Sequence, residues 1–323
     1  MLSRVADSLY WMGRNIERAE NNARVVSIRL INMLEVSDGE MYSDRDWEEV
    51  IEICSSLTEY HLLYHTLDTD SIIQYLSFSD HNLNSISNCV TYARENAKSS
   101  RETLPEELWE SLNECYWLVK DLNRIDWSIR EVHSFLYHIK QLSFTSQGII
   151  ESCMPRDVPH AFIQIGKWLE RAEKTARILN VISEKTFLID DKKTADNYYY
   201  WLAALQFVNG FDAYLKQYPP VMTAPQVLQF LIGEKVFPRS IRYCIDHVMA
   251  AVRDIEDGKV SHYSEELFDA MNRLDQEFQS IDFQKVSQEE LKSFLDRFQN
   301  HCNEIGSIFS RTYYLLDPAA GSL

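Results

Sequence analysis

One twelve-residue pattern occurs twice in this chain, and the recurrence limits the architectures that the sequence can adopt. The segment GRNIERAENNAR at residues 13–24 returns as GKWLERAEKTAR at residues 166–177, an offset of 153 positions with seven of twelve residues identical. Three further sets of matches follow in the same order at offsets of 154, 155 and 159: Trp47, Tyr60 and Tyr64 with Trp201, Tyr214 and Tyr218; 74–76 and 85–89 with 229–231 and 240–244; and 106–113 with 265–272. The conserved order predicts two copies of one unit of about 155 residues, far longer than a solenoid repeat.

Each copy has the hydrophobic periodicity of helices. Apolar residues recur at spacings of three and four through about 3–36, 44–66, 84–103, 106–121 and 126–152, and strand-like alternation is absent from the sequence pattern. With 9 Gly and 8 Pro in 323 residues, few tight turns are available, which disfavours all-β and βαβ architectures. We therefore predict an all-α, tandem-duplicated multi-helix bundle. Its helical repeats would be 1–153 and 154–323, related by a pseudo-twofold axis and packed as one body.

Local signals predict several helix starts and loops. Ser43 and Thr103 each precede an acidic stretch, as residues before a helix often do, and Pro238 fits the first position of a helix. Loops are expected at about 66–72, 184–192 and 219–225.

Charge and cysteine spacing indicate which classes of partner and compartment to expect. The formal net charge is −17, from 32 Lys and Arg against 49 Asp and Glu, so the long-range field repels nucleic acid and anionic lipid. We expect no nucleic-acid partner. No apolar run of about 18 residues predicts a membrane span, and the first residues lack the pattern of a secretory signal. The 6 cysteines are widely separated, which is typical of a reduced cytoplasmic protein.

The repeated helix combines an apolar stripe with a polar face. At about 100° per residue, one face holds only apolar residues: Leu9, Met12, Ile16, Ala19, Ala23, Val26 and Leu30, and in the second copy Ile165, Leu169, Ala172, Ala176 and Leu179. The adjoining face carries Gly13, Glu17, Glu20 and Arg24, and Gly166, Glu170, Glu173 and Arg177, while Arg18 and Arg171 point elsewhere. A glycine inside a helix costs about 1 kcal/mol relative to alanine, so Gly13 and Gly166 predict close approach by another backbone or a ligand.

This polar face has two interpretations. In the structural one, Glu20–Arg24 and Glu173–Arg177 are i,i+4 ion pairs that stabilise their own helices. In the functional one, the two copies bring all four glutamates and both arginines to a shared cleft. Such a cleft would hold an amino acid, a peptide or another carboxylate ligand, because Arg binds carboxylate with two hydrogen bonds.

A metal site and an anion site are two further possibilities. Carboxylates on facing helices also occur in di-iron bundles, but those sites use Glu-x-x-His, and here two arginines would compete for the oxygens. We expect no metal and no cofactor. A second candidate, around Arg239 in Phe237–Arg242, combines a helix start with two arginines, as anion sites do. Ordinary helix capping is the alternative.

The chain resembles the bacterial alpha-E domain family, a helical family named for a Glu-Arg motif. The stretches that carry the resemblance are SRVADSLYWMGRNIERAENNARVV, TYARENAKSSRETLPEELWESLN, MPRDVPHAFIQIGKWLERAEKTARIL and VFPRSIRYC, which together span most of the chain. The resemblance implies an all-α fold. It also implies a setting beside a circularly permuted ATP-grasp amide ligase and a transglutaminase-like protease, with no established reaction and no catalytic residues to transfer.

Three functions follow as hypotheses. The leading one is a non-catalytic binding or scaffold partner of the ATP-grasp ligase and the transglutaminase-like protease, supported by the family setting. An enzyme that uses the paired glutamates as acid/base groups or metal ligands is the alternative. In the third, the Glu-Arg helices form only the packing seam of a structural helical protein.

Overall fold

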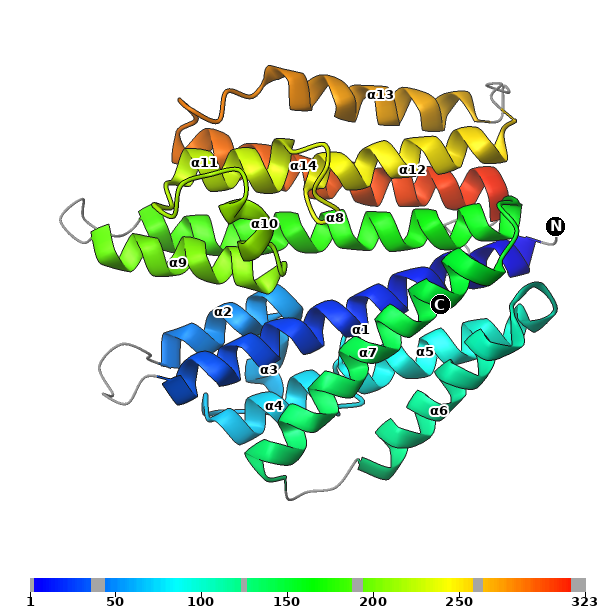
Figure 1. Cartoon of the computed structure of the whole chain (residues 1–323), viewed down its shortest axis with the longest axis horizontal. Helices are drawn as coiled ribbons and strands as arrows, with labels where there is room; N and C mark the ends of the chain where they lie inside the picture. The colour runs from blue at the N-terminus through cyan, green and yellow to red at the C-terminus, as the bar shows by residue number, and fades with distance from the viewer. Residues whose placement is uncertain (1–2, 36–43, 123–126, 188–193, 258–263, 315–323) are drawn as a thin grey trace. The chain divides into compact units, whose positions relative to one another are not determined.

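The computed structural model describes residues 3–35, 44–122, 127–187, 194–257 and 264–314 (Figure 1). Throughout these ranges the regular structure is helical, and no strand occurs in them. The predicted all-α class is therefore correct. Ser43, expected before a helix, lies outside the described residues, and helix α2 begins at the next position.

The chain divides into two compact units. The 11–155 unit is continuous in sequence, and the 156–323 unit also includes the residues up to Tyr10. Tyr10 belongs there because its ring lies 5.5 Å from that of Phe309. The repeats predicted from sequence, 1–153 and 154–323, assign these first residues to the other half of the chain.

The 11–155 unit is built around the long helix α1 and the later helix α7. Helix α5 packs against α6, and α6 against α7. Two short helices, α3 and α4, follow α2 before the chain reaches α5. The elements are α1 (Ser3–Glu35), α2 (Asp44–Cys54), α3 (Leu57–Leu63), α4 (Thr69–Ser77), α5 (Ile86–Ser99), the 3₁₀ turn η1 (Arg101–Thr103), α6 (Glu106–Leu122) and α7 (Ile129–Cys153).

The 156–323 unit is built around α8, which packs against both α12 and α14. Helix α13 lies along α14, as Figure 1 shows. The elements are α8 (Val158–Phe187), α9 (Thr194–Phe207), α10 (Phe211–Leu215), α11 (Ala224–Leu228), the π-helical turn η2 (Gln229–Gly233), α12 (Ile241–Ile255), α13 (Glu265–Ser280), α14 (Gln288–Phe309) and the π-helical turn η3 (Ser310–Tyr314).

The apolar stripe predicted on the repeated helix is buried. Each of its members on α1 and α8 is at most 4% exposed. The stripe forms part of the core because its side chains recur at helical spacing and lie on one side of each helix.

An aromatic arrangement recurs in the two units. Tyr60 stacks on Tyr64 at 5.0 Å, and Tyr75 meets Tyr60 edge-on at 5.1 Å. In the other unit Tyr214 stacks on Tyr218 at 4.9 Å, and Phe230 meets Tyr214 edge-on at 5.6 Å. These are the preferred geometries for aromatic pairs. Burial raises the pKa of Tyr60 to about 12, helped by the nearby Asp68 carboxylate, and burial also raises the pKa of Tyr214.

Segment 44–66, predicted as one helical stretch, is interrupted at two serines. Ser55 donates to Asn82 Oδ1 at 2.9 Å, and Ser56 caps α3 by accepting the Glu59 N–H. The predicted loop at 66–72 is also shorter than expected. Asp68 accepts the Ser71 N–H at 2.9 Å and so starts α4 at Thr69.

Other predicted boundaries shift by a few residues. Thr103 ends η1 and donates to Ser100 O, and α6 begins at Glu106. Helix α8 continues to Phe187, through the first part of the loop expected at 184–192, whose remaining residues lie outside the described ranges. Pro225 lies in the first turn of α11 and ends the predicted loop at 219–225, as its fixed φ allows.

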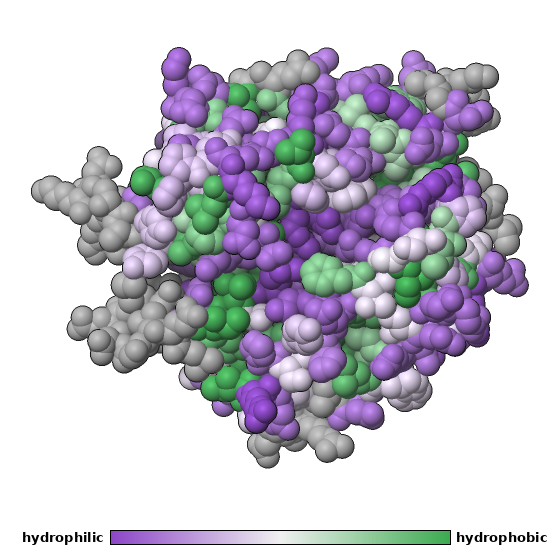
Figure 2. Space-filling view, in the orientation of Figure 1, coloured by the Kyte–Doolittle hydropathy of each residue, from purple (hydrophilic) through white to green (hydrophobic). Residues whose placement is uncertain are grey.

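Charged and polar side chains cover most of the face seen in Figure 2, with hydrophobic side chains in separate patches. This distribution agrees with the large excess of acidic residues. None of the helices in the described part of the chain combines the length and the apolar character needed to cross a bilayer.

Candidate functional site

The two Glu-Arg helices bury charged side chains to an unusual degree. Glu17 and Glu20 on α1 are fully buried, and Arg24 is 7% exposed. On α8, Glu170 is 4% exposed, whereas Glu173 and Arg177 are half-buried. Charged residues are rarely buried to this extent unless they are paired, so their partners decide what the site can do.

In the 11–155 unit, α1 and α7 form a connected set of polar contacts. Glu17 accepts hydrogen bonds from Asn21 and from Gln147 of α7, both at 3.3 Å. Arg24 donates to Glu20 in an i,i+4 ion pair, and the Arg24 guanidinium lies 6.0 Å from the centre of the Phe144 ring. The i,i+4 ion pair expected between Glu20 and Arg24 is therefore present. We call Glu17, Glu20, Arg24, Ser27, Lys140 and Gln147 the α1–α7 polar cluster.

Lys140 is the cationic member that α7 contributes to this cluster. Its Nζ donates to Ser27 Oγ at 3.2 Å. Partial burial lowers the pKa of Lys140 most, the neighbouring Arg24 lowers it further, and Glu20 acts in the opposite direction. The sequence did not predict Lys140, Ser27 and Gln147 as members of this cluster, because the contacts that they make across α1 and α7 depend on how the two helices pack.

The motif arginines bind residues that precede a helix. Arg18 donates to Asn84 Oδ1 at 2.9 Å, and Arg171 donates to Pro238 O at 3.4 Å. One turn later on each helix, Asn22 donates to Asn84 O at 2.8 Å and Thr175 donates to Arg239 O at 2.9 Å. Asn84 and Arg239 directly precede the serines that cap the next helices, Ser85 for α5 and Ser240 for α12.

We call these contacts the cap clamp. The motif helix holds the start of α5 in one unit and of α12 in the other. The repeat contained one signal for the cap clamp, because the matched positions 22 and 175 both hold polar residues.

The helix start predicted at Pro238 is wrong. Helix α12 begins at Ile241, and Ser240 caps it by accepting the Tyr243 N–H at 3.1 Å. Pro238 lies in the preceding turn, which is closed by the Ser240 N–H donating to Phe237 O at 3.0 Å. The serine side chain satisfies an N–H of the first turn, as the capping alternative proposes. Arg239 is 9% exposed, and its carbonyl accepts the Thr175 hydroxyl.

Gly13 and Gly166 lie inside α1 and α8 and are buried. The close helix crossing or ligand approach expected at these glycines stays a prediction. The shared cleft of the two motif helices also stays a prediction.

Comparison with protein families identifies the chain. A family model described as a predicted alpha-helical domain with a conserved ER motif, Alpha-E, matches residues 1–314. The chain belongs to the Alpha-E family. No curated protein matches it, and no solved structure matches it.

This Alpha-E chain carries Glu-Arg at residues 17–18 and again at 170–171. In both places the arginine is a member of the cap clamp. The second copy adds an aromatic support, because the Arg171 guanidinium lies 4.8 Å from the centre of the Trp168 ring and that ring lies 4.9 Å from His247. The described residues of the Alpha-E chain contain no group of three His, Cys, Asp or Glu side chains placed to hold a metal ion.

Proposed function

We propose that this Alpha-E protein is a non-catalytic binding or scaffold partner of a circularly permuted ATP-grasp amide ligase and a transglutaminase-like protease. The observation that carries the proposal is the cap clamp: within its own unit, Arg18 binds the Asn84 side chain and Arg171 binds the Pro238 carbonyl. An arginine with that task shapes the fold and is not placed to stabilise a transition state. The Glu-Arg motif then maintains a surface that partners recognise.

We propose further that the chain is a tandem duplication with a pseudo-twofold axis, and that its two halves pack as one body. The recurring aromatic stack and cap clamp support the duplication, because both occur at matching positions. In the packed body the glutamates and arginines of the two motif helices would line a cleft for an amino acid or a peptide. A cytoplasmic location fits this role, because the ligase partner consumes ATP.

An enzyme remains the second candidate because of Lys140. A half-buried lysine with a lowered pKa, next to Ser27 and Glu20, has features of groups that transfer protons in active sites. The third candidate, a structural packing seam, is favoured by the inward pairing of Glu20 with Arg24.

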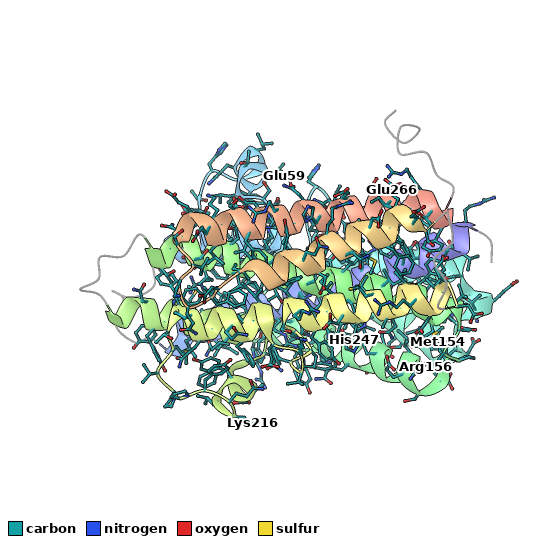
Figure 3. The ribbon with its side chains drawn as sticks, turned by 90° about the horizontal axis from the view of Figure 1, so that it is seen from above. Glu59, Met154, Arg156, Lys216, His247 and Glu266 are labelled. Atoms are coloured by element: carbon teal, nitrogen blue, oxygen red, sulfur yellow. The ribbon has the colours of Figure 1, made fainter. Side chains whose placement is uncertain are left out.

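Co-purification from a native bacterial host tests the partner role. We expect the full-length tagged chain to retain the ATP-grasp ligase. A variant that alters the surface, Glu266→Gln, serves as a control for tag and charge effects, because this exposed residue lies at the start of α13 (Figure 3).

Two outcomes would overturn the proposal. Failure of the chain to retain the ligase, with no effect of the purified chain on ligase turnover, removes the partner role. Amide or peptide hydrolysis by the purified chain that is lost in Lys140→Met would assign the function to an enzyme instead.

A further inference from the structure

A cavity of about 530 Å³ opens in the 156–323 unit, away from the Glu-Arg residues. Its walls come from the π-helical turn η2, the segment after it, the start of α12 and the connection between α13 and α14. The volume lies within the usual range for small-molecule sites. π-Helical turns are rare and occur frequently at functional sites.

The cavity has an apolar wall formed by two aromatic rings. Phe278 and Phe283 line it and are 9% and 8% exposed. Ile281 adds an aliphatic contact beside them. This wall suits an apolar or aromatic group of a ligand.

Arg242 is a fixed guanidinium at this cavity. Its Nε pairs with Asp246 at 3.0 Å and its Nη1 with Asp275 at 2.5 Å, and the group lies 5.8 Å from the centre of the Phe278 ring. Two carboxylates and a ring therefore hold its orientation. Of the five guanidinium N–H groups, the contacts within the described residues occupy two, so the Nη edge can still bind a ligand carboxylate.

Two further donors line the same cavity. Lys235 is exposed and has no ion-pair partner among the described residues. Gln229 folds back over Gly233, where an added β-carbon would lie 2.6 Å from Gln229 Nε2. Gly233 is needed for this position of the amide, since any side chain would displace it.

The charges around the cavity select among anions. Lys235 and Arg242 are the positive groups of the lining, and Asp246 and Asp275 both pair with the Arg242 guanidinium. Asp282 also lines the cavity, and its carboxylate lies 3.8 Å from the Lys285 ammonium. Positive and negative charges balance. A dianionic phosphate would be repelled strongly by the three carboxylates, whereas a monoanion or a zwitterion would bind the arginine with less repulsion.

We propose that this cavity binds an α-carboxylate with an adjacent apolar or aromatic side chain, from either a free amino acid or a peptide C-terminus. The carboxylate binds Arg242 and Lys235, and the side chain contacts Phe278 and Phe283. In a free amino acid, the ammonium group pairs with Asp282. The site stands on its own geometry and does not require the ligase.

Calorimetric titration of the purified full-length chain tests this assignment with four probes: L-phenylalanine, N-acetyl-L-phenylalanine, L-phenylalaninamide and inorganic phosphate. We expect one or both carboxylates to bind, and the amide to bind at least about tenfold more weakly because charge-assisted hydrogen bonds are lost. Tighter binding of the free amino acid than of its N-acetyl form identifies the amino acid as the source. Equal or tighter binding of the N-acetyl form identifies a peptide C-terminus.

Variants connect the binding to this cavity. Arg242→Lys keeps the charge but removes the forked geometry, and should weaken carboxylate binding about tenfold or more. Lys235→Gln alters an exposed residue and should weaken binding several-fold without changing the melting temperature. Lys216→Gln is the matched control, because Lys216 is an exposed lysine of the same unit at the end of α10, outside the cavity lining (Figure 3).

Three results would overturn the proposal. The first is that neither carboxylate produces heat up to millimolar concentration. The second is that the amide or phosphate binds as tightly as the acids, and the third is that Lys235→Gln binds as well as Lys216→Gln. Because every arm uses the chain alone, these results leave the partner role in amide synthesis to its own experiment.

Discussion

Helices α1 and α8 carry the same Glu-Arg pattern. Some of their contacts recur in both units, whereas others differ between the units. Among those that recur, Asn22 and Thr175 both donate to the carbonyl before a capping serine. Among those that differ, Ser27 of α1 accepts from Lys140 of α7, whereas the matching residue of α8, Asn180, donates to Asp296 of α14 at 3.0 Å.

The difference teaches which contacts tolerate sequence change. In the recurring bond the acceptor is a backbone carbonyl, which is present whatever the side chain, so Asn and Thr can serve equally as donors. In the differing bond both partners are side chains, and a change in one requires a change in the other. Helices α1 and α8 therefore contact the capped helices in the same way, whereas their side-chain contacts with α7 and α14 differ, with a lysine in one unit and an aspartate in the other.

Breaking the ion pair on α1 should have the largest effect. Arg24→Ala removes the i,i+4 cation from the fully buried Glu20 carboxylate, and we expect a loss of up to about 3–5 kcal/mol in unfolding free energy. Arg177→Ala alters a half-buried arginine and should cost less. Urea unfolding of both variants measures the contrast.

The double variant Arg24→Ala/Glu20→Gln is the control for this comparison. Neutralising the carboxylate should recover part of the lost stability, because the cost arises from a buried charge that has lost its i,i+4 cation. Equal losses for Arg24→Ala and Arg177→Ala, with no recovery in the double variant, would show that the two copies use these arginines alike.

Breaking the cap clamp should have a smaller effect that is similar in the two units. Asn22→Ala and Thr175→Ala each remove a side-chain donor from the carbonyl before a capping serine, and each should lower the unfolding free energy by about 1–2 kcal/mol. Ser85→Ala and Ser240→Ala should each cost about 1 kcal/mol through the lost cap. Thermal and urea unfolding provide the values.

Asn22→Thr sharpens this test because it installs the donor that the other unit uses. It should cost less than Asn22→Ala if a hydroxyl on α1 can reach Asn84 O. A strong loss in Asn22→Ala with none in Thr175→Ala would contradict the view that one device serves both units.

The sequence predicted the helices well because periodicity and repetition are local or pairwise properties of the chain. It failed where a side chain decides a boundary: Ser56 interrupts a helical pattern, Asp68 starts α4 within an expected loop, and Ser240 begins α12 later than Pro238 would. Each is a capping residue whose effect depends on competition with neighbouring candidates.

The candidate site was predictable only on the repeated helix itself. Glu20 and Arg24 pair as their spacing indicates, because i,i+4 residues meet on any helix. Lys140 lies more than a hundred residues away from Ser27 in the chain, and no local pattern marks the face that α7 turns toward α1. The cavity near Arg242 likewise depends on a connection between α13 and α14 that carries no motif.

The smallest expected effect concerns the contact between Lys140 of α7 and Ser27 of α1, and it depends on pH. The pKa of Lys140 is lowered in the folded chain, so between that value and the ordinary value of 10.5 the unfolded chain binds more protons and stability rises with pH. Below that window the folded chain is destabilised by a partly buried ammonium group. Lys140→Met removes this charge but also removes the hydrogen bond to Ser27.

We expect the unfolding free energy of Lys140→Met to lie within about 1 kcal/mol of the wild-type value at pH 7, since Lys140 is only half-buried. As the pH rises to 10, the variant should become less stable relative to the wild type. Asp296→Asn, which alters the corresponding contact in the other unit and leaves Lys140 in place, should show no such trend. Urea unfolding from pH 7 to 10 measures both, and a constant difference between Lys140→Met and the wild type would show that burial does not penalise this lysine.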